Sequence, residues 1–168
     1  YFDLVRLFKN IPLITSPLSP SEFYEVEQVN PELVYAQIET DLNAALPFLP
    51  LTVAEAEKGR ITKGAGQALL GKVILFQNNE SRMTEAGNLF NEVIQSGVYQ
   101  LLPAFGDIFR YDNKFNAESI LEITHTSVAV GYWGPWPPAG EGHIFTQMCG
   151  PRAYAGPLYQ AGWGFNPV

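Results

Sequence analysis

Aromatic side chains are concentrated near the end of the sequence, in a stretch rich in glycine and proline. Between residues 132 and 163 the chain carries Tyr132, Trp133, Trp136, Tyr154, Tyr159 and Trp163. A rigid ring offers a large apolar surface at low entropic cost, which suits packing against the C–H face of a sugar ring. Trp133 and Trp136 are the strongest candidates, because the Gly134-Pro135 turn would hold two indoles at a fixed separation. The structural alternative is that these rings only pin a long loop onto the fold.

Polar side chains in the same stretch could hydrogen-bond the hydroxyl groups of such a ligand. The candidate ligand-binding residues are Trp133, Trp136, Tyr132, Tyr154 and Arg152. Further polar candidates are His125, His143 and Gln147. The two histidines have no convincing His, Cys or carboxylate companion at ligand spacing, so the sequence predicts no metal site. It predicts no cofactor either.

Carboxylates near the aromatic stretch raise a catalytic alternative, since glycosidases place two of them on either side of the scissile bond. The available ones are Asp107, Asp112, Glu118, Glu122 and Glu141. No Gly-x-Ser-x-Gly elbow, phosphate-binding loop or dinucleotide fingerprint accompanies them. We therefore expect a protein that is not an enzyme.

The composition narrows the choice of partners. Only 16% of the 168 residues are charged, and the net charge is −7 with no basic cluster. This composition disfavours nucleic acid as a ligand, because phosphate binding needs concentrated lysine and arginine. The single cysteine, Cys149, excludes an internal disulfide. No apolar run approaches the ~20 residues of a membrane span.

Helices are expected ahead of the aromatic stretch and must position it. Residues 1–8 form one apolar, helical run. Asn30 and Pro31 form a cap followed by a first-turn proline, which predicts a helix that ends at Pro47. Thr62 is the predicted N-cap of a helix that reaches about residue 78. Ser81 is expected to cap the next helix, which runs to a left-handed glycine at residue 97.

Small residues line one side of the helix that follows Thr62. Gly64, Ala68 and Gly71 fall at i, i+4 and i+7, so we expect another backbone to pack closely there. Leu70-Gly71-x-x-Ile74, followed by Ala86-x-x-x-Phe90, approximates the tetratricopeptide pattern with an enlarged turn. The predicted fold class is mainly α, a tetratricopeptide-like helical repeat with long ordered loops and little β structure. The only expected strand covers residues 119–126.

The domain prediction is a single domain over residues 1–168. Residues 1–125 form its helical scaffold, and residues 126–168 form an aromatic-rich loop region. The many aromatic residues of that region argue against disorder.

Several motifs occur in a fixed order along the chain. They are Tyr1-Phe2-Asp3-Leu4-Val5-Arg6-Leu7-Phe8 with Ile11-Pro12-Leu13, Tyr35-x-Gln37-Ile38-x-x-Asp41-Leu42 closing on Leu49-Pro50, Gly59-Arg60 through Lys72, Ser96-Gly97-x-Tyr99-x-Leu101-x-Pro103-x-Phe105-x-Asp107-x-Phe109, Asn116-x-Glu118-Ser119-Ile120-Leu121-Glu122-Ile123, and Gly162-Trp163-Gly164. In order and spacing this series resembles the SusD/RagB family of nutrient-binding outer-membrane lipoproteins. Residues 127–161 match no pattern of that family.

The resemblance implies a tetratricopeptide-like scaffold that captures a glycan at the cell surface. It also implies delivery of the glycan to a SusC-like TonB-dependent transporter, and attachment to the outer membrane through a lipid. The lipid-bearing cysteine of the family has no counterpart here, and the chain opens on Tyr1 rather than Met. We therefore expect a middle fragment of such a protein. The alternative is a helical-repeat module for protein–protein interaction with no glycan site in this fragment.

Overall fold

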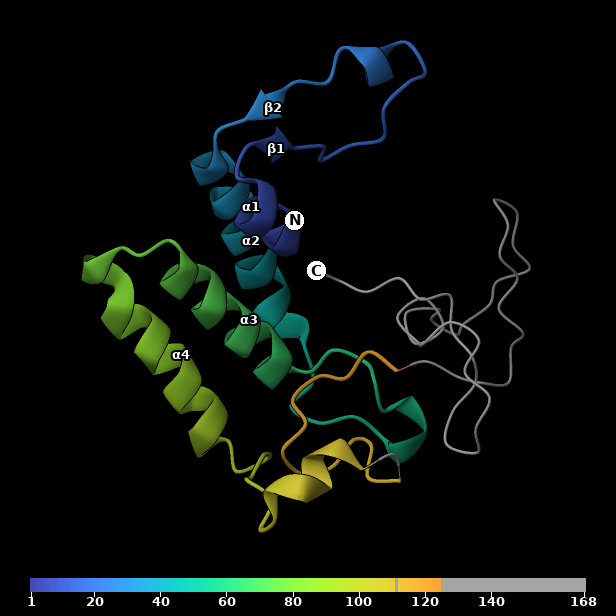
Figure 1. The fold of residues 1–168 in the computed structure, drawn as a ribbon, viewed down its shortest axis with the longest axis vertical. Coiled ribbons are helices and arrows are strands. Elements are labelled where there is room, and N and C mark those ends of the chain that lie inside the picture. The colour runs from blue at the N-terminus through green and yellow to red at the C-terminus, as the bar shows by residue number, and fades with distance from the viewer. Residues whose placement is uncertain (111, 125–168) are drawn as a thin grey trace, which may run out of the picture. The chain divides into compact units, whose positions relative to one another are not determined.

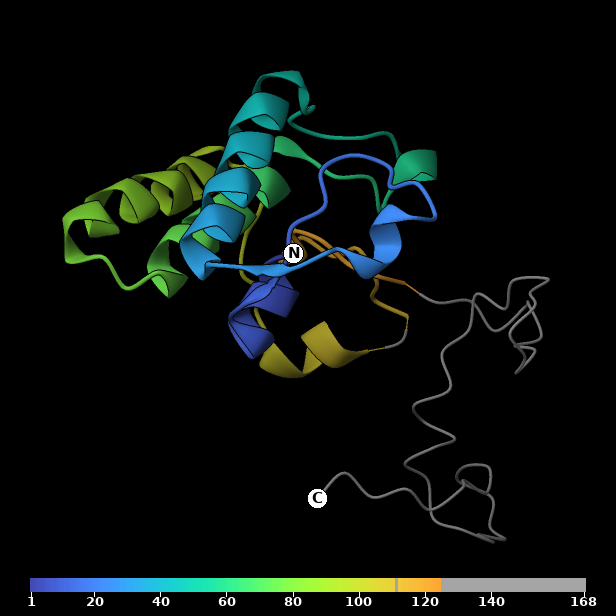
Figure 2. The ribbon, with the colours of Figure 1, turned by 90° about the horizontal axis from the view of Figure 1, so that it is seen from above.

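The computed structural model describes residues 1–110 and 112–124, and the chain divides into two units, Tyr1–Glu122 and Ile123–Val168. The first unit is mainly helical (Figures 1 and 2), with α1 (Phe2–Phe8), α2 (Pro31–Ala45), α3 (Lys63–Phe76) and α4 (Met83–Gln95). Strands β1 (Ile11–Pro12) and β2 (Gln28–Val29) pair antiparallel between α1 and α2. Short 3-10 helices occupy Glu22–Tyr24, Leu46–Phe48, Glu55–Glu57, Glu80–Arg82 and Phe105–Phe109. For the described residues, the prediction of a mainly helical fold with little β structure is confirmed.

Helices α2 and α3 begin where their capping residues predict. The side chain of Asn30 accepts a hydrogen bond from the Glu32 N–H at 3.3 Å, and Pro31 takes the first helical position. The hydroxyl of Thr62 accepts one from the Ala65 N–H, also at 3.3 Å. Each cap satisfies a first-turn N–H that has no partner within its own helix.

Helix α3 is the most buried helix of the described residues. Its buried residues are Gly64, Ala65, Gly66, Gln67, Leu70, Gly71, Val73 and Ile74. Side chains, rather than a second backbone, fill the space that its glycines leave open. A Cβ added to Gly71 would lie 2.7 Å from the ring of Phe90, and one added to Gly64 would lie 2.5 Å from the ring of Tyr99. The expectation of a closely packed backbone is therefore wrong, because aromatic rings occupy those positions.

Helix α4 begins later than predicted. The side chain of Asn79 accepts hydrogen bonds from the Ser81 N–H at 3.1 Å and from its hydroxyl at 2.8 Å. Ser81 consequently lies inside the 3-10 helix and does not cap α4, whose preceding residue Arg82 makes no side-chain cap. The other end agrees with prediction, since Gly97 has a φ of 68°.

No strand forms over residues 119–124, the described part of the predicted strand at 119–126. The Ser119 N–H donates to the carbonyl of Asn116 at 3.0 Å, a local turn rather than a ladder. The alternating apolar residues suited a strand, but a strand also needs a paired neighbour for its backbone groups.

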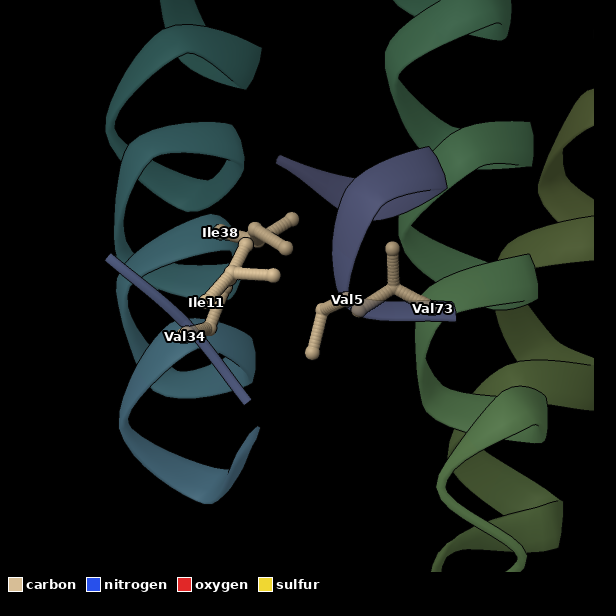
Figure 3. Packing of buried hydrophobic residues seen from close by; sticks show 5 residues of the cluster. All are labelled: Val5, Ile11, Val34, Ile38 and Val73. Atoms are coloured by element: carbon tan, nitrogen blue, oxygen red, sulfur yellow. The ribbon is translucent and has the colours of Figure 1, made fainter. Parts of the chain in front are cut away.

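Two apolar clusters form the core. The first contains Val5, Ile11, Val34, Ile38 and Val73, so it joins α1, β1, α2 and α3. Figure 3 shows Val34 and Ile38 of α2 directed toward Val5 and Val73. The second cluster contains Leu70, Ile74 and Ala86, and it joins α3 to α4. Helix α3 contributes Val73 to the first cluster and Leu70 and Ile74 to the second, so it is shared by the whole core, and the partly buried Leu42 of α2 packs against both clusters.

An ion pair ties α2 to the start of α4. The guanidinium of Arg82 donates to both carboxylate oxygens of Glu39, at 2.8 and 2.7 Å, and also binds Glu85. Gln77 donates to the same Glu39 carboxylate at 2.7 Å. These hydrogen bonds, the one from Arg82 foremost, hold the pKa of Glu39 below its usual value.

We expect Gly71→Ala and Gly87→Ala to change stability in opposite directions. The new methyl group at residue 71 must displace the Phe90 ring, at a cost of about 1–2 kcal/mol. At residue 87 of α4 nothing lies within 4 Å of the added carbon. There alanine should stabilise the helix by about 0.5–1 kcal/mol. Denaturant unfolding of the intact protein measures both changes, and two shifts of the same sign would contradict this account.

We expect Glu39→Gln to cost about 1.5 kcal/mol at pH 7, because Arg82 loses a charged partner but keeps Glu85. The lowered pKa means that ionised Glu39 stabilises the fold above the unfolded value near 4.5. That contribution is lost as the pH falls from there through the folded pKa. The stability gap between wild type and variant should therefore narrow below about pH 4.5. As a control, Asp112→Asn breaks the exposed Arg110 pair and should change stability little.

Candidate functional site

The residues predicted to bind ligand lie outside the described residues. This applies to all five of them, Tyr132, Trp133, Trp136, Arg152 and Tyr154, and to His125, His143 and Gln147. The structure describes the scaffold that precedes them in the sequence, and this scaffold contains a cavity.

A cavity of about 370 Å³ lies between the loop before α3 and the segment that ends the first unit. Its lining is Leu51, Thr52, Val53, Lys58, Gly59, Arg60, Thr62, Val98, Tyr99, Phe115, Asn116, Ala117, Ser119, Ile120, Leu121 and Glu122. We call it the Phe115 cavity. Aromatic, hydroxyl, amide and charged side chains all border it, so it is chemically mixed rather than apolar.

Two unusual backbone conformations meet at the wall of this cavity. Phe115 has a φ of 52°, which is uncommon for any residue with a side chain. Gly59 has a φ of 103°, and a Cβ at that position would lie 3.7 Å from the Phe115 ring. The carboxylate of Glu122 accepts a hydrogen bond from the Phe115 N–H at 2.7 Å and so helps to hold this conformation.

Hydrogen bonds fix the rest of the wall. The Tyr99 hydroxyl shares one with the Thr62 hydroxyl at 2.8 Å, so the residue that caps α3 also anchors the cavity. The Gln100 N–H donates to the carbonyl of Ala117 at 2.9 Å. The Leu102 N–H donates to the carboxylate of Glu118 at 3.0 Å. The segments 98–102 and 115–122 are thereby tied together.

Glu118 and Glu122 thus act as acceptors for backbone N–H groups. The sequence had offered both as members of a catalytic pair of carboxylates. Each instead binds a main-chain donor of its own segment or of the neighbouring one. Their geometry is that of structural anchors for the wall.

The cations of the cavity are already paired. Lys58 forms an ion pair with Glu55 at 2.9 Å, and Arg60 forms one with Glu57. In both pairs the glutamate belongs to the 3-10 helix Glu55–Glu57, and the basic residue lies three positions later in the sequence. Because nearby carboxylates offset the positive charge, the cavity has no strong preference for an anion.

A second, more open cavity of about 540 Å³ surrounds the Glu39 ion pair. It is lined by Glu32, Ala36, Glu39, Thr40, Asn43, Gln77 and Arg82. Its Glu39 and Arg82 side chains hydrogen-bond each other, and Gln77 donates to Glu39, so this hollow follows from the joint between α2 and the start of α4. Within residues 1–110 and 112–124, no group of three His, Cys, Asp or Glu side chains could hold a metal ion. A search of the same residues finds no helix with the length and hydropathy to cross a bilayer.

Sequence reasoning missed the Phe115 cavity, although its walls lie in motifs that were recognised individually. Gly59-Arg60, Tyr99 and the run from Asn116 to Glu122 were read as separate matches. One available signal was Gly59, which precedes the predicted cap Thr62, since glycine suits a position with positive φ. Nothing local, however, indicates that Phe115 packs beside Gly59.

Comparison with known proteins shows that the chain is similar to SusD-like proteins. The family model SusD-like_3, described as starch-binding associating with outer membrane, matches residues 1–75. A SusD-like protein, P25, of Formosa agariphila is 26% identical over 124 residues, which cover 73% of this chain and 23% of that protein. A SusD-like protein of Bacteroides ovatus is 27% identical over 148 residues.

Solved structures extend the match beyond the first helices. A laminarin binding SusD-like protein is 42% identical, with a TM-score of 0.81 over 99% of this chain and 38% of that one. Surface glycan-binding protein A from Bacteroides thetaiotaomicron, in complex with laminarihexaose, is 29% identical with a TM-score of 0.73 over 84% of this chain and 31% of its own. These neighbours confirm the tetratricopeptide-like helical fold. The chain spans roughly a quarter to two fifths of the length of these relatives.

Proposed function

Because this chain belongs to the SusD-like family, we propose that it binds oligosaccharide or polysaccharide without cleaving it. The observation that carries the proposal is the 42% identity to a laminarin binding SusD-like protein, which extends over 99% of this chain. A second neighbour was solved with laminarihexaose bound. Laminarin is accordingly the glycan that we propose for this protein.

The proposed binding residues are those of the aromatic-rich segment, namely Tyr132, Trp133, Trp136, Arg152 and Tyr154. Their support comes from the sequence. The two indoles on either side of Gly134-Pro135 would stack on sugar rings, and Arg152 would hydrogen-bond their hydroxyls. Glycan recognition of this kind needs no metal or cofactor.

The absence of catalysis belongs to the same proposal. Hydrolysis of a glycosidic bond needs two carboxylates that face the bond from either side. Glu118 and Glu122 are occupied by backbone N–H groups, and Asp112 is paired with Arg110. Two of these carboxylates therefore each hold a backbone N–H group, and the third is neutralised by a surface ion pair.

The place of binding that we propose is the cell surface, with a lipid anchor on the outer membrane in the intact protein. The partner is a SusC-like TonB-dependent transporter, which receives the captured glycan. Support comes from the description of the matched family, which associates with the outer membrane. Neighbours from Bacteroides that are called surface glycan-binding proteins agree with it. The acidic, weakly charged composition disfavours nucleic acid as a partner.

We expect the double variant Trp133→Ala and Trp136→Ala to bind laminarihexaose at least thirtyfold more weakly than wild type. Each indole would contribute on the scale of an interface anchor, about 1–2 kcal/mol. Calorimetric titration of the intact protein measures the loss. Tyr24→Ala is the matched control, because Tyr24 is 95% exposed in the 3-10 turn after β1. An unchanged affinity in the double variant would exclude the two indoles from the site.

A tryptophan-fluorescence titration of the wild-type protein against soluble polysaccharides precedes these variants. Saturable binding of laminarin supports the proposal. No change with any glycan of a broad panel would favour a helical-repeat module for protein–protein interaction instead.

A further inference from the structure

We propose that the Phe115 cavity is itself a carbohydrate subsite, formed by described residues of the first unit, which holds one or two sugar rings. This inference rests on the proposed function for the class of its ligand. Its location is argued from the described residues that line the cavity, all of which belong to the unit Tyr1–Glu122.

The strained aromatic residue is the first observation that supports a subsite. A left-handed conformation is strained for a bulky residue, and such conformations gather at binding sites. Phe115 keeps this conformation through the hydrogen bond from its N–H to Glu122. Its ring is half-buried beside Gly59 and also borders the cavity. The ring is thus held in one position, as a stacking platform for a sugar requires.

Unused hydrogen-bonding groups are the second observation. The hydroxyls of Thr52 and Ser119 make no side-chain hydrogen bond within residues 1–110 and 112–124. Oε1 of Glu122 accepts a hydrogen bond from the Phe115 N–H. Oε2 of the same carboxylate has no hydrogen-bond donor among the described residues. Hydroxyl and carboxylate groups around an aromatic ring are complementary to a sugar, which offers hydroxyls at its edge and C–H groups on its face.

Size and charge agree with a small, neutral ligand. A volume of about 370 Å³ lies at the lower end of the ~300–1,000 Å³ typical of small-molecule pockets. Lys58 and Arg60 are each offset by a carboxylate three residues away. A phosphorylated or sulfated ligand would need unpaired cations, so a neutral saccharide is favoured.

The first test compares Phe115→Leu with Phe105→Leu in the intact protein. Leucine keeps an apolar side chain beside Gly59 but removes the flat ring. Phe105 is 75% exposed and lies outside the cavity, so it controls for the loss of an exposed aromatic ring. We expect laminarihexaose to bind about tenfold more weakly to Phe115→Leu and unchanged to Phe105→Leu. Equal affinity of both variants and wild type would overturn the subsite.

The second test needs no variant and therefore holds even if Phe115→Leu folds poorly. Amide hydrogen exchange of the intact wild-type protein is compared with and without laminarihexaose. We expect slower exchange at residues 57–62 and 115–122. Slower exchange confined to residues 126–168 would overturn the subsite and leave the proposed function standing. If titration detects no glycan binding at all, the proposed function and the subsite both fall.

Discussion

The insertion of aromatic side chains into the glycine positions of α3 is the constraint on which the described fold depends. Phe90 of α4 occupies the space beside Gly71, and Tyr99 occupies the space beside Gly64. Any larger residue at either glycine would have to displace a ring, in an interior packed to near crystal density. Helix α3 also contributes Val73 to the cluster shared with α1 and α2. The helices α1, α2 and α4 therefore all share core contacts with α3.

The same contact connects the helical core to the cavity. Tyr99 covers Gly64 and shares a hydrogen bond with the hydroxyl of Thr62, which in turn caps α3. From Tyr99 the chain continues to Gln100 and Leu102, whose N–H groups donate to the Ala117 carbonyl and to the Glu118 carboxylate, respectively. The wall that carries Phe115 is thus held by a short series of hydrogen bonds that begins at the helix cap. A rigid wall of this kind is what a preorganised binding surface requires.

The glutamate side chains of the first unit have two different structural roles. Glu39 forms a charged joint with Arg82, whereas Glu118 and Glu122 satisfy backbone N–H groups in a segment without regular secondary structure. Buried or half-buried backbone donors must find an acceptor, and side chains supply it where no helix or ladder does. A scaffold that carries long loops needs many such anchors. This is the physical reason why acidic residues near a proposed glycan site need not be catalytic.

Local signals in the sequence determined the helices and the family. The caps at Asn30 and Thr62 and the left-handed Gly97 were predictable, because each depends on residues two to four positions away. The prediction that Ser81 caps α4 was wrong, because Asn79, two residues earlier, caps the preceding 3-10 helix and accepts the hydrogen bond from the Ser81 N–H. The ordered motifs indicated a SusD-like protein, and the comparisons agree. The aromatic ligand residues at 132–154 remain a prediction from sequence, outside the described residues.

Only the tertiary structure decided what fills the glycine positions of α3 and where the cavity lies. Small residues at i, i+4 and i+7 indicate that something approaches closely, but their spacing is the same for a backbone and for a ring. The Thr62–Tyr99 hydrogen bond joins residues 37 positions apart, and the Phe115 ring reaches Gly59 across an even longer separation in sequence. Contacts of this kind depend on how whole helices pack, and no local pattern of residues encodes them. The sequence by itself therefore determined the elements and the kind of protein, and packing determined the partners that shape the cavity.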